Sequence, residues 1–135
     1  MRALIDEGIE ILDKAEEKNE KLERLINMGK FISSSLTTGI NAKEMFRLRN
    51  KLHASESREE LRKIADSMEK LIKDEIKNAE NSISLVEVDS RLGWEPSMEY
   101  MTDREHIEWK IRLENYILDY ELPGLRAAID KERVK

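Results

Sequence analysis

The side chains that could do chemistry gather in one irregular segment, residues 89–100, with the sequence DSRLGWEPSMEY. It combines acidic, basic and aromatic residues between two strongly helical patterns. Gly93 permits a positive φ, and Pro96 keeps the preceding residue out of the α region. A loop of this composition usually holds a particular surface in place. The candidate site residues are Asp89, Arg91, Trp94, Glu95, Glu99 and Tyr100.

Three roles are open to this segment. Arg91 can form a bidentate pair with one of the loop carboxylates, and together with a buried Trp94 it would pin a rigid corner between two helices. The rings of Trp94 and Tyr100 could instead contact a sugar or a protein surface. Glu95 and the carboxylate four residues later could act as acid and base on a glycosidic bond. Residue types favour the corner first and the acid–base pair least, so we expect a chain that is not an enzyme.

Elsewhere the sequence offers little for catalysis or metal binding. His53 lies where it can serve the last carbonyls of a helix, and His106 has no second histidine nearby. The paired Glu-x-x-His motifs of a di-iron bundle are missing. The hydroxyls of residues 33–35 have no base beside them and indicate a capping loop. With no cysteine, Gly-rich phosphate loop or nucleophile elbow in the sequence, we expect no catalytic residue, metal or cofactor.

Composition limits the partners. Charged residues make up 39% of the chain and are mixed in sign, with a net charge of −5, whereas a nucleic-acid binder usually carries a basic stripe. No apolar run approaches the roughly 20 residues of a membrane span. Asp6, Glu7 and Glu10 interrupt the apolar core that a signal peptide would need. We therefore expect neither nucleic acid nor a membrane as partner. The chain as it stands favours the cytoplasm, although its sequence fixes no compartment.

The candidate loop is positioned by helices. Gly and Pro are scarce, at 5 and 2 residues, and apolar residues recur at three- and four-residue spacing. A helix over residues 2–29 would end at Gly29, and a hydroxyl-rich break over residues 31–40 would follow, although that stretch could also continue as a kinked helix. The later helices are expected over residues 41–54, 58–88, 103–121 and 125–133.

Local signals mark the ends of these helices. Ser57 and Glu60 form a capping box before the third helix, and Thr102 and Glu105 form another before the fourth. Leu122-Pro123-Gly124 predicts the end of the fourth helix. The third helix should lie antiparallel to the first or to the second. Apolar residues occupy both faces of the fourth, so it is central or contacts a further body. The prediction is an all-α, up-and-down bundle of four main helices, two of them long, plus a short C-terminal helix, with residues 1–135 in one domain.

The segment Asp89-Ser90-Arg91-Leu92-Gly93-Trp94-Glu95, followed by Tyr100 and by Trp109-Lys110-Ile111, resembles the C-terminal helical region of large, mostly uncharacterised bacterial proteins. Those proteins carry glycoside-hydrolase-like barrels. Residues 40–43 and 75–80 are similar to the same tails, so the resemblance covers residues 30–122. Only residues 89–95 are specific, because the remainder is ordinary helix.

The resemblance implies a non-catalytic accessory domain, part of a larger protein. A barrel needs about 200 residues or more, so the catalytic groups would lie elsewhere in the parent. The domain would pack on the parent's catalytic domain through an apolar patch, and its 89–100 loop could reach the carbohydrate site. The alternative is a stand-alone oligomeric helical module, in which the long helices pair with a second copy.

Overall fold

The computed structural model describes residues 1–89, 92, 94–95 and 100–131, with the backbone alone at residues 94, 95, 100 and 101. Apart from one two-residue hairpin, the elements in this part of the chain are helices, which confirms the predicted all-α class. They are α1 (Arg2–Asp13), α2 (Glu20–Ala54), α3 (Arg58–Val88), β1 (Trp94–Glu95), β2 (Tyr100–Met101), α4 (Arg104–Tyr116), the π-helical turn η1 (Ile117–Glu121) and α5 (Leu122–Lys131).

The first predicted helix is in fact two helices. α1 ends at Asp13, and α2 begins after Asn19, whose side chain accepts a hydrogen bond from the backbone N–H of Leu22 at 3.0 Å. An asparagine in this position satisfies one of the free N–H groups of a new helix. The prediction of one helix over residues 2–29 was therefore wrong. The predicted helix over residues 58–88 is the long helix α3, but the other long helix is α2 and not the first helix of the prediction.

The predicted break over residues 31–40 is also wrong, because α2 runs through it. Ser35 and Thr37 donate hydrogen bonds to the carbonyls four residues earlier, at 3.0 and 2.8 Å. Hydroxyls bonded in this way remain compatible with a helix. Gly29, predicted to end the first helix, lies inside α2, where a Cβ would meet the Ile9 side chain of α1 at 3.0 Å.

The third helix has the bounds that the sequence predicts. Ser57 is its N-cap, and its hydroxyl accepts a hydrogen bond from the Glu60 N–H at 3.4 Å. The Glu60 carboxylate in turn accepts one from the Ser55 hydroxyl at 2.7 Å, which ties the helix start to the end of α2. α3 packs against α2, one of the two partners expected for it.

The last third of the chain departs from the prediction at both ends of α4. Asp103, not Thr102, is the N-cap, and its carboxylate accepts the N–H of His106 at 2.9 Å. The helix does not stop at Pro123 but continues through η1 into α5. Pro123 has no N–H for a regular turn. The π turn just before it, in which the Leu122 N–H bonds to the Ile117 carbonyl, inserts an extra residue and lets the chain continue.

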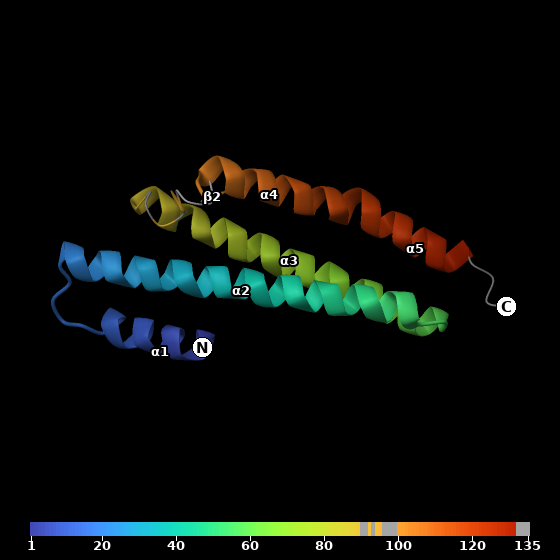
Figure 1. Ribbon diagram of the computed structural model, residues 1–135, viewed down its shortest axis with the longest axis horizontal. Helices are drawn as coiled ribbons and strands as arrows, with labels where there is room; N and C mark the ends of the chain where they lie inside the picture. Colours follow the sequence, from blue (N-terminus) through green and yellow to red (C-terminus); the bar gives the residue numbers. More distant parts are fainter. Residues whose placement is uncertain (90–91, 93, 96–99, 132–135) are drawn as a thin grey trace.

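The helices lie side by side in chain order, each running opposite to the one before it, with α4, η1 and α5 in one line (Figure 1). Extensive contacts join α1 to α2, α2 to α3, and α3 to both α4 and α5. The core contains two small apolar clusters: Ala65, Leu122 and Ile129 where α3 meets α5, and Ala79, Val86 and Ile107 where α3 meets α4. No large side chain among the described residues is fully buried. A helical layer this thin leaves apolar faces uncovered.

Candidate functional site

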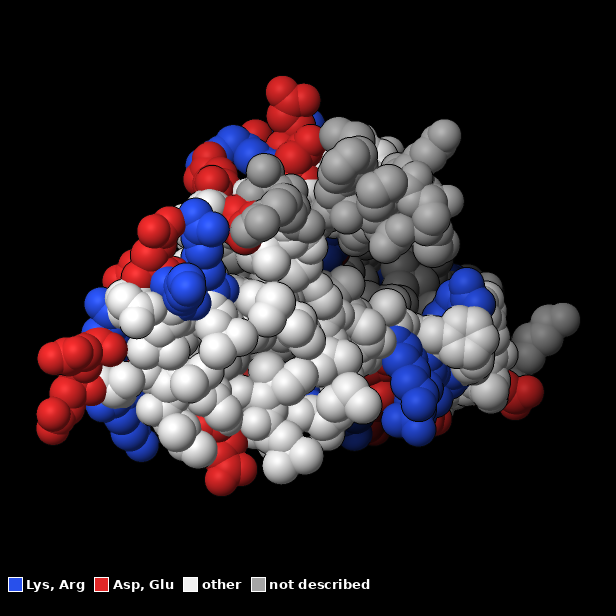
Figure 2. Space-filling view, turned by 60° about the vertical axis from the view of Figure 1, so that its left-hand side comes forward, with Lys and Arg blue, Asp and Glu red and all other residues white. Residues whose placement is uncertain are grey.

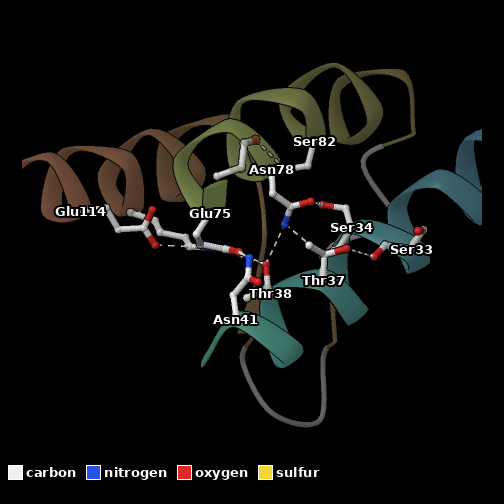
Figure 3. A network of polar contacts seen from close by, with 11 residues as sticks. Ser33, Ser34, Thr37, Thr38, Asn41, Glu75, Asn78, Ser82 and Glu114 are labelled. Atoms are coloured by element: carbon white, nitrogen blue, oxygen red, sulfur yellow. Dashed lines mark hydrogen bonds and ion pairs between the residues drawn. The ribbon is translucent and has the colours of Figure 1, made fainter. Parts of the chain in front are cut away.

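One carboxylate joins three helices at the centre of the layer. Glu75 of α3 is buried, with 7% of its surface exposed. It accepts hydrogen bonds from Thr38 Oγ1 at 2.5 Å and from Asn41 Nδ2 at 2.6 Å, both on α2 (Figure 3). It accepts a third from Lys110 Nζ on α4. Hydrogen bonds to an ionised group are about twice as strong as neutral ones. Glu75 is therefore the polar anchor between α2, α3 and α4.

Helical spacing positions each member of this anchor. Glu75 follows the buried Ile72 by three residues and precedes the buried Ala79 by four, so it lies on the inward stripe of α3. Thr38 and Asn41 are three residues apart and lie on the face of α2 toward α3. Lys110 is three residues after the buried Ile107 of α4. Its long side chain carries the ammonium group from that stripe to the carboxylate.

A second set of polar contacts continues from this anchor toward α1. The Asn78 side chain donates to the Ser34 carbonyl and to Thr38 Oγ1, both at 3.1 Å, and accepts a hydrogen bond from the Ser34 hydroxyl at 3.2 Å. The neighbouring Ser33 hydroxyl donates to Asp6 of α1 at 2.5 Å. The polar contacts thus run across the helices from α1 to α4, and Figure 3 shows the central ones.

The two carboxylates near Lys110 differ in their electrostatics. Burial acts to raise the pKa of Glu75, but hydrogen bonds from Lys110 and from α2 outweigh it, so this pKa lies below its usual value. Burial raises the pKa of Glu114 to about 7, against the attraction of Lys110 and with the help of repulsion from Glu75. Glu114 Oε2 is buried and has no hydrogen-bond partner among the described residues. Lys110 Nζ stays 4.0 Å from its other oxygen. Glu114 therefore holds its proton more tightly than an exposed glutamate does.

A groove lies beside these carboxylates, between α2, α3 and the α4–η1 segment, with a volume of about 410 Å³. Its walls are mostly apolar and are formed by Ala42, Met45, Met68, Leu71, Ile72 and Ile117. Glu75, Lys110 and Glu114 supply its polar side.

The cation and the hydroxyls of the polar cluster are engaged in contacts within it. The Lys110 ammonium is held by Glu75, and the Ser34 hydroxyl donates to an amide and not to a base. In the described part of the chain, no three side chains of His, Cys, Asp or Glu lie where they could hold a metal ion. What the cluster can do is fix the register of three helices.

The structure describes only part of the predicted site segment, residues 89–100. Asp89 is half-buried at the C-terminal end of α3, and its carbonyl accepts the Leu92 N–H at 3.0 Å. β1 and β2 form an antiparallel pair in which Trp94 faces Met101 and Glu95 faces Tyr100. Arg91 and Glu99 lie outside the described residues, as do the side chains of the four paired residues. The corner pinned by Arg91 and Trp94 stays a prediction.

The residues of the buried cluster were not predicted. We expected functional carboxylates only in the 89–100 segment, and we expected a hydroxyl-rich break where the serines and threonines of α2 lie. A signal was present, because Glu75 interrupts an otherwise apolar stripe at a position three residues after Ile72. Glu114 lies in the same way on the predicted apolar face of the fourth helix, between Ile111 and Leu118. A charge at such a position indicates a buried partner.

No protein-family model, curated protein or solved structure matches this chain. The resemblance of residues 89–95 to the tails of glycoside-hydrolase-like proteins stays a prediction. Within the described residues, no helix has the length and apolar character needed to cross a membrane.

Proposed function

We propose that this chain is a non-catalytic helical domain that works by docking on another protein. The main support is a broad uncharged area on the end of the molecule where α1 ends and α2 begins, with charged side chains gathered at its margins (Figure 2). The segments that form this end expose Ile11, Leu25 and Met28, and 64% of the Ile11 surface is accessible. Exposed apolar side chains that gather within an uncharged area commonly mark contact surfaces.

The distribution of polar and apolar side chains also supports a docking role, because polar groups are paired between the helices while apolar ones are exposed. Glu75 and Lys110 satisfy each other between the helices, whereas several large apolar side chains remain in solvent. An enzyme of this size would need a site in which reactive groups converge on open space. In the groove of about 410 Å³ between α2, α3 and α4–η1, the Lys110 ammonium is held by Glu75, so the residues there favour a binding role.

The resemblance of the 89–100 segment extends the proposal to a parent protein. The domain would be an accessory part of a glycoside-hydrolase-like bacterial protein, packed on its catalytic domain as an up-and-down bundle. β2 lies at the same end of the molecule as the connection between α1 and α2 (Figure 1). The uncharged area and the 89–100 loop would therefore face the same neighbour, and the loop could reach a carbohydrate site.

Binding to a neighbouring catalytic domain tests this function directly. Sequencing the reading frame around the gene segment identifies any barrel domain, which is then produced separately and titrated with this chain by calorimetry. We expect binding, and we expect the double substitution Leu25→Glu and Met28→Glu to weaken it at least tenfold. The control is Phe46→Glu in the C-terminal third of α2, an apolar residue of similar exposure away from this end. A barrel that binds wild type and both variants alike, or none of them, would remove the proposal.

A glycan screen separates the two roles of the loop. If the loop contacts carbohydrate, Arg91→Ala and Trp94→Ala should abolish binding while the melting temperature of the isolated chain stays unchanged. If instead Arg91 pins a corner, Arg91→Ala should lower the stability by about 2 kcal/mol or more, the cost of breaking a buried ion pair. The two outcomes are distinct in one set of variants.

The stand-alone oligomeric module remains the alternative, and a second apolar surface favours it. Trp109 and Tyr120 on the outer face of α4 and η1 are 60% and 66% exposed. This surface is separate from the uncharged end, so a domain could use both.

A further inference from the structure

Four large apolar side chains form a stripe along the outer face of α4 and η1. They are Trp109, Leu113, Tyr116 and Tyr120, and between 46% and 66% of each is exposed. The helix packed against α4 is α3, on the side away from these residues, and the other extensive contacts of α4 are with η1, its own continuation. The rings of Tyr116 and Tyr120 stack with their centroids 4.9 Å apart, which keeps Tyr120 on the stripe although it lies in the π turn. We call these four residues the aromatic stripe.

The spacing of the aromatic stripe is that of a helix-pairing seam. Its members are separated by four, three and four residues, the alternation of core positions in a coiled coil. An amphipathic helix that only covers its own core needs no such seam on the side away from it. The aromatic stripe therefore matches the contact face of another helix.

Charges beside the aromatic stripe indicate what that other helix is. Arg112 and Asp119 are seven residues apart along the same edge, both exposed. Neither makes an ion pair or side-chain hydrogen bond within the described part of the chain. Their opposite signs make the edge complementary to a copy of itself that runs in the reverse direction.

We propose that two copies of this chain pair through the aromatic stripe, with the two α4–η1 segments antiparallel about a two-fold axis midway between Leu113 and Tyr116. In this register Leu113 packs on Tyr116 of the partner subunit, and Trp109 packs on Tyr120 of the partner subunit. Arg112 then lies opposite Asp119 of the partner subunit, and the symmetry forms this pair twice.

A parallel arrangement of the two α4–η1 segments matches the flanking charges less well. It would set Arg112 beside Ile117 of the partner subunit, because flanking positions in parallel pairs meet five residues further along. Both charges would then be left without a partner. The short seam predicts a modest affinity, with a Kd on the order of tens of micromolar, since specific interfaces below about 1,200 Å² are weak.

The inference rests on the proposed function, because it names one partner of an interaction domain. Sedimentation velocity of the chain from about 1 to 500 μM should show a monomer–dimer equilibrium, since tens of micromolar is the expected Kd. We expect Arg112→Asp and Asp119→Arg each to weaken the dimer at least tenfold, and the double variant, with the charges exchanged, to recover most of it. Arg47→Asp, an exposed residue of α2, is the matched control and should have no effect. Circular dichroism checks that every variant is folded.

Cysteine cross-linking gives the direction, because the chain has no cysteine of its own. Mixed Trp109→Cys and Tyr120→Cys chains should form a disulfide-linked heterodimer. Trp109→Cys alone should not, since eleven residues of helix, roughly 16 Å, would separate its two copies. A chain that stays monomeric at 500 μM, or a charge exchange that fails to recover the dimer, overturns the inference. Docking on a catalytic domain through Leu25 and Met28 would still be measurable, so the two failures are distinguishable.

Discussion

Lys110 of α4 donates a hydrogen bond to the carboxylate of Glu75 on α3, at a point where only 9% of the Glu75 side chain is exposed. α2 adds two donors to the same carboxylate. A buried ion pair stabilises little when compared with good apolar packing, but removing one member leaves the other uncompensated. The pair therefore acts less as a source of stability than as a constraint on which residues of the three helices can face one another.

Substitution of either Glu75 or Lys110 should destabilise the folded chain. We expect Glu75→Leu and Lys110→Met each to lower the free energy of unfolding by about 2 to 4 kcal/mol, because each strands a partner. The double variant should lose clearly less than the sum of the two. Urea denaturation at pH 7 measures all three. Lys63→Met, which removes an exposed pair with Glu59 on the same helix, should have little effect. Strictly additive losses would contradict the coupling.

Glu114 should make stability depend on pH in the opposite sense to Glu75. Its pKa is about 7 in the folded chain against an ordinary value of 4.5. The folded state then holds the proton more tightly than the unfolded state, so stability is full below pH 4.5 and falls as pH rises toward 7. At about 1.4 kcal/mol per pKa unit, the loss is on the order of 1 to 3 kcal/mol.

Glu114→Gln should remove this dependence. We expect the variant to match wild type near pH 4.5 and to be more stable than wild type at pH 8. Thermal unfolding across this range makes the comparison. Glu121→Gln, an exposed residue of the same groove, is the control and should follow wild type throughout. The lowered pKa of Glu75 contributes stability above its ordinary range that is lost as pH falls. If Glu114→Gln is no more stable at pH 8, the carboxylate is not buried as described.

The helices could be predicted where apolar spacing and a single cap agree. α3 is the example, since its stripe is almost unbroken and Ser57 with Glu60 forms a capping box at its start. The predicted helix ends were wrong where a residue is compatible both with the end of a helix and with its continuation. Ser35 and Thr37 could have capped a new helix, but they bond to the preceding turn. Pro123 could have ended α4, but a π turn accommodates it. Tertiary contacts decide between such uses, and the local sequence does not contain them.

The buried cluster illustrates the same limit for the candidate site. The position of Glu75 on the apolar stripe of α3 was readable from the sequence. Its partners were not, because Thr38 and Lys110 lie 37 and 35 residues away, on different helices. These partners can be predicted only when it is known which helices are neighbours and in what register they pack.

Two glycines of α2 should respond differently to alanine. At Gly39 a Cβ meets nothing within 4 Å, so Gly39→Ala should stabilise the chain by about 0.5 to 1 kcal/mol through helix propensity. At Gly29 the Cβ would lie 3.0 Å from Ile9 Cγ1 of α1. Gly29→Ala should therefore gain less than Gly39→Ala or lose stability outright. Thermal denaturation of the two variants decides, and equal gains would mean that α1 does not approach α2 at this point.

α1 should be the first helix to open. It has 12 residues, none of them buried, and its extensive contacts are with α2 alone. Short helices with few buried contacts open locally at low free energy. Hydrogen exchange should therefore be fast in α1 and slowest near Ile72 and Ala79 of α3. Ser33→Ala removes the hydrogen bond to Asp6 and should speed exchange in α1 while leaving α3 unchanged. Ser35→Ala is the matched control, since its hydroxyl bonds only within α2. Exchange in α1 as slow as in α3 would show that the helix is held by more than the contacts described.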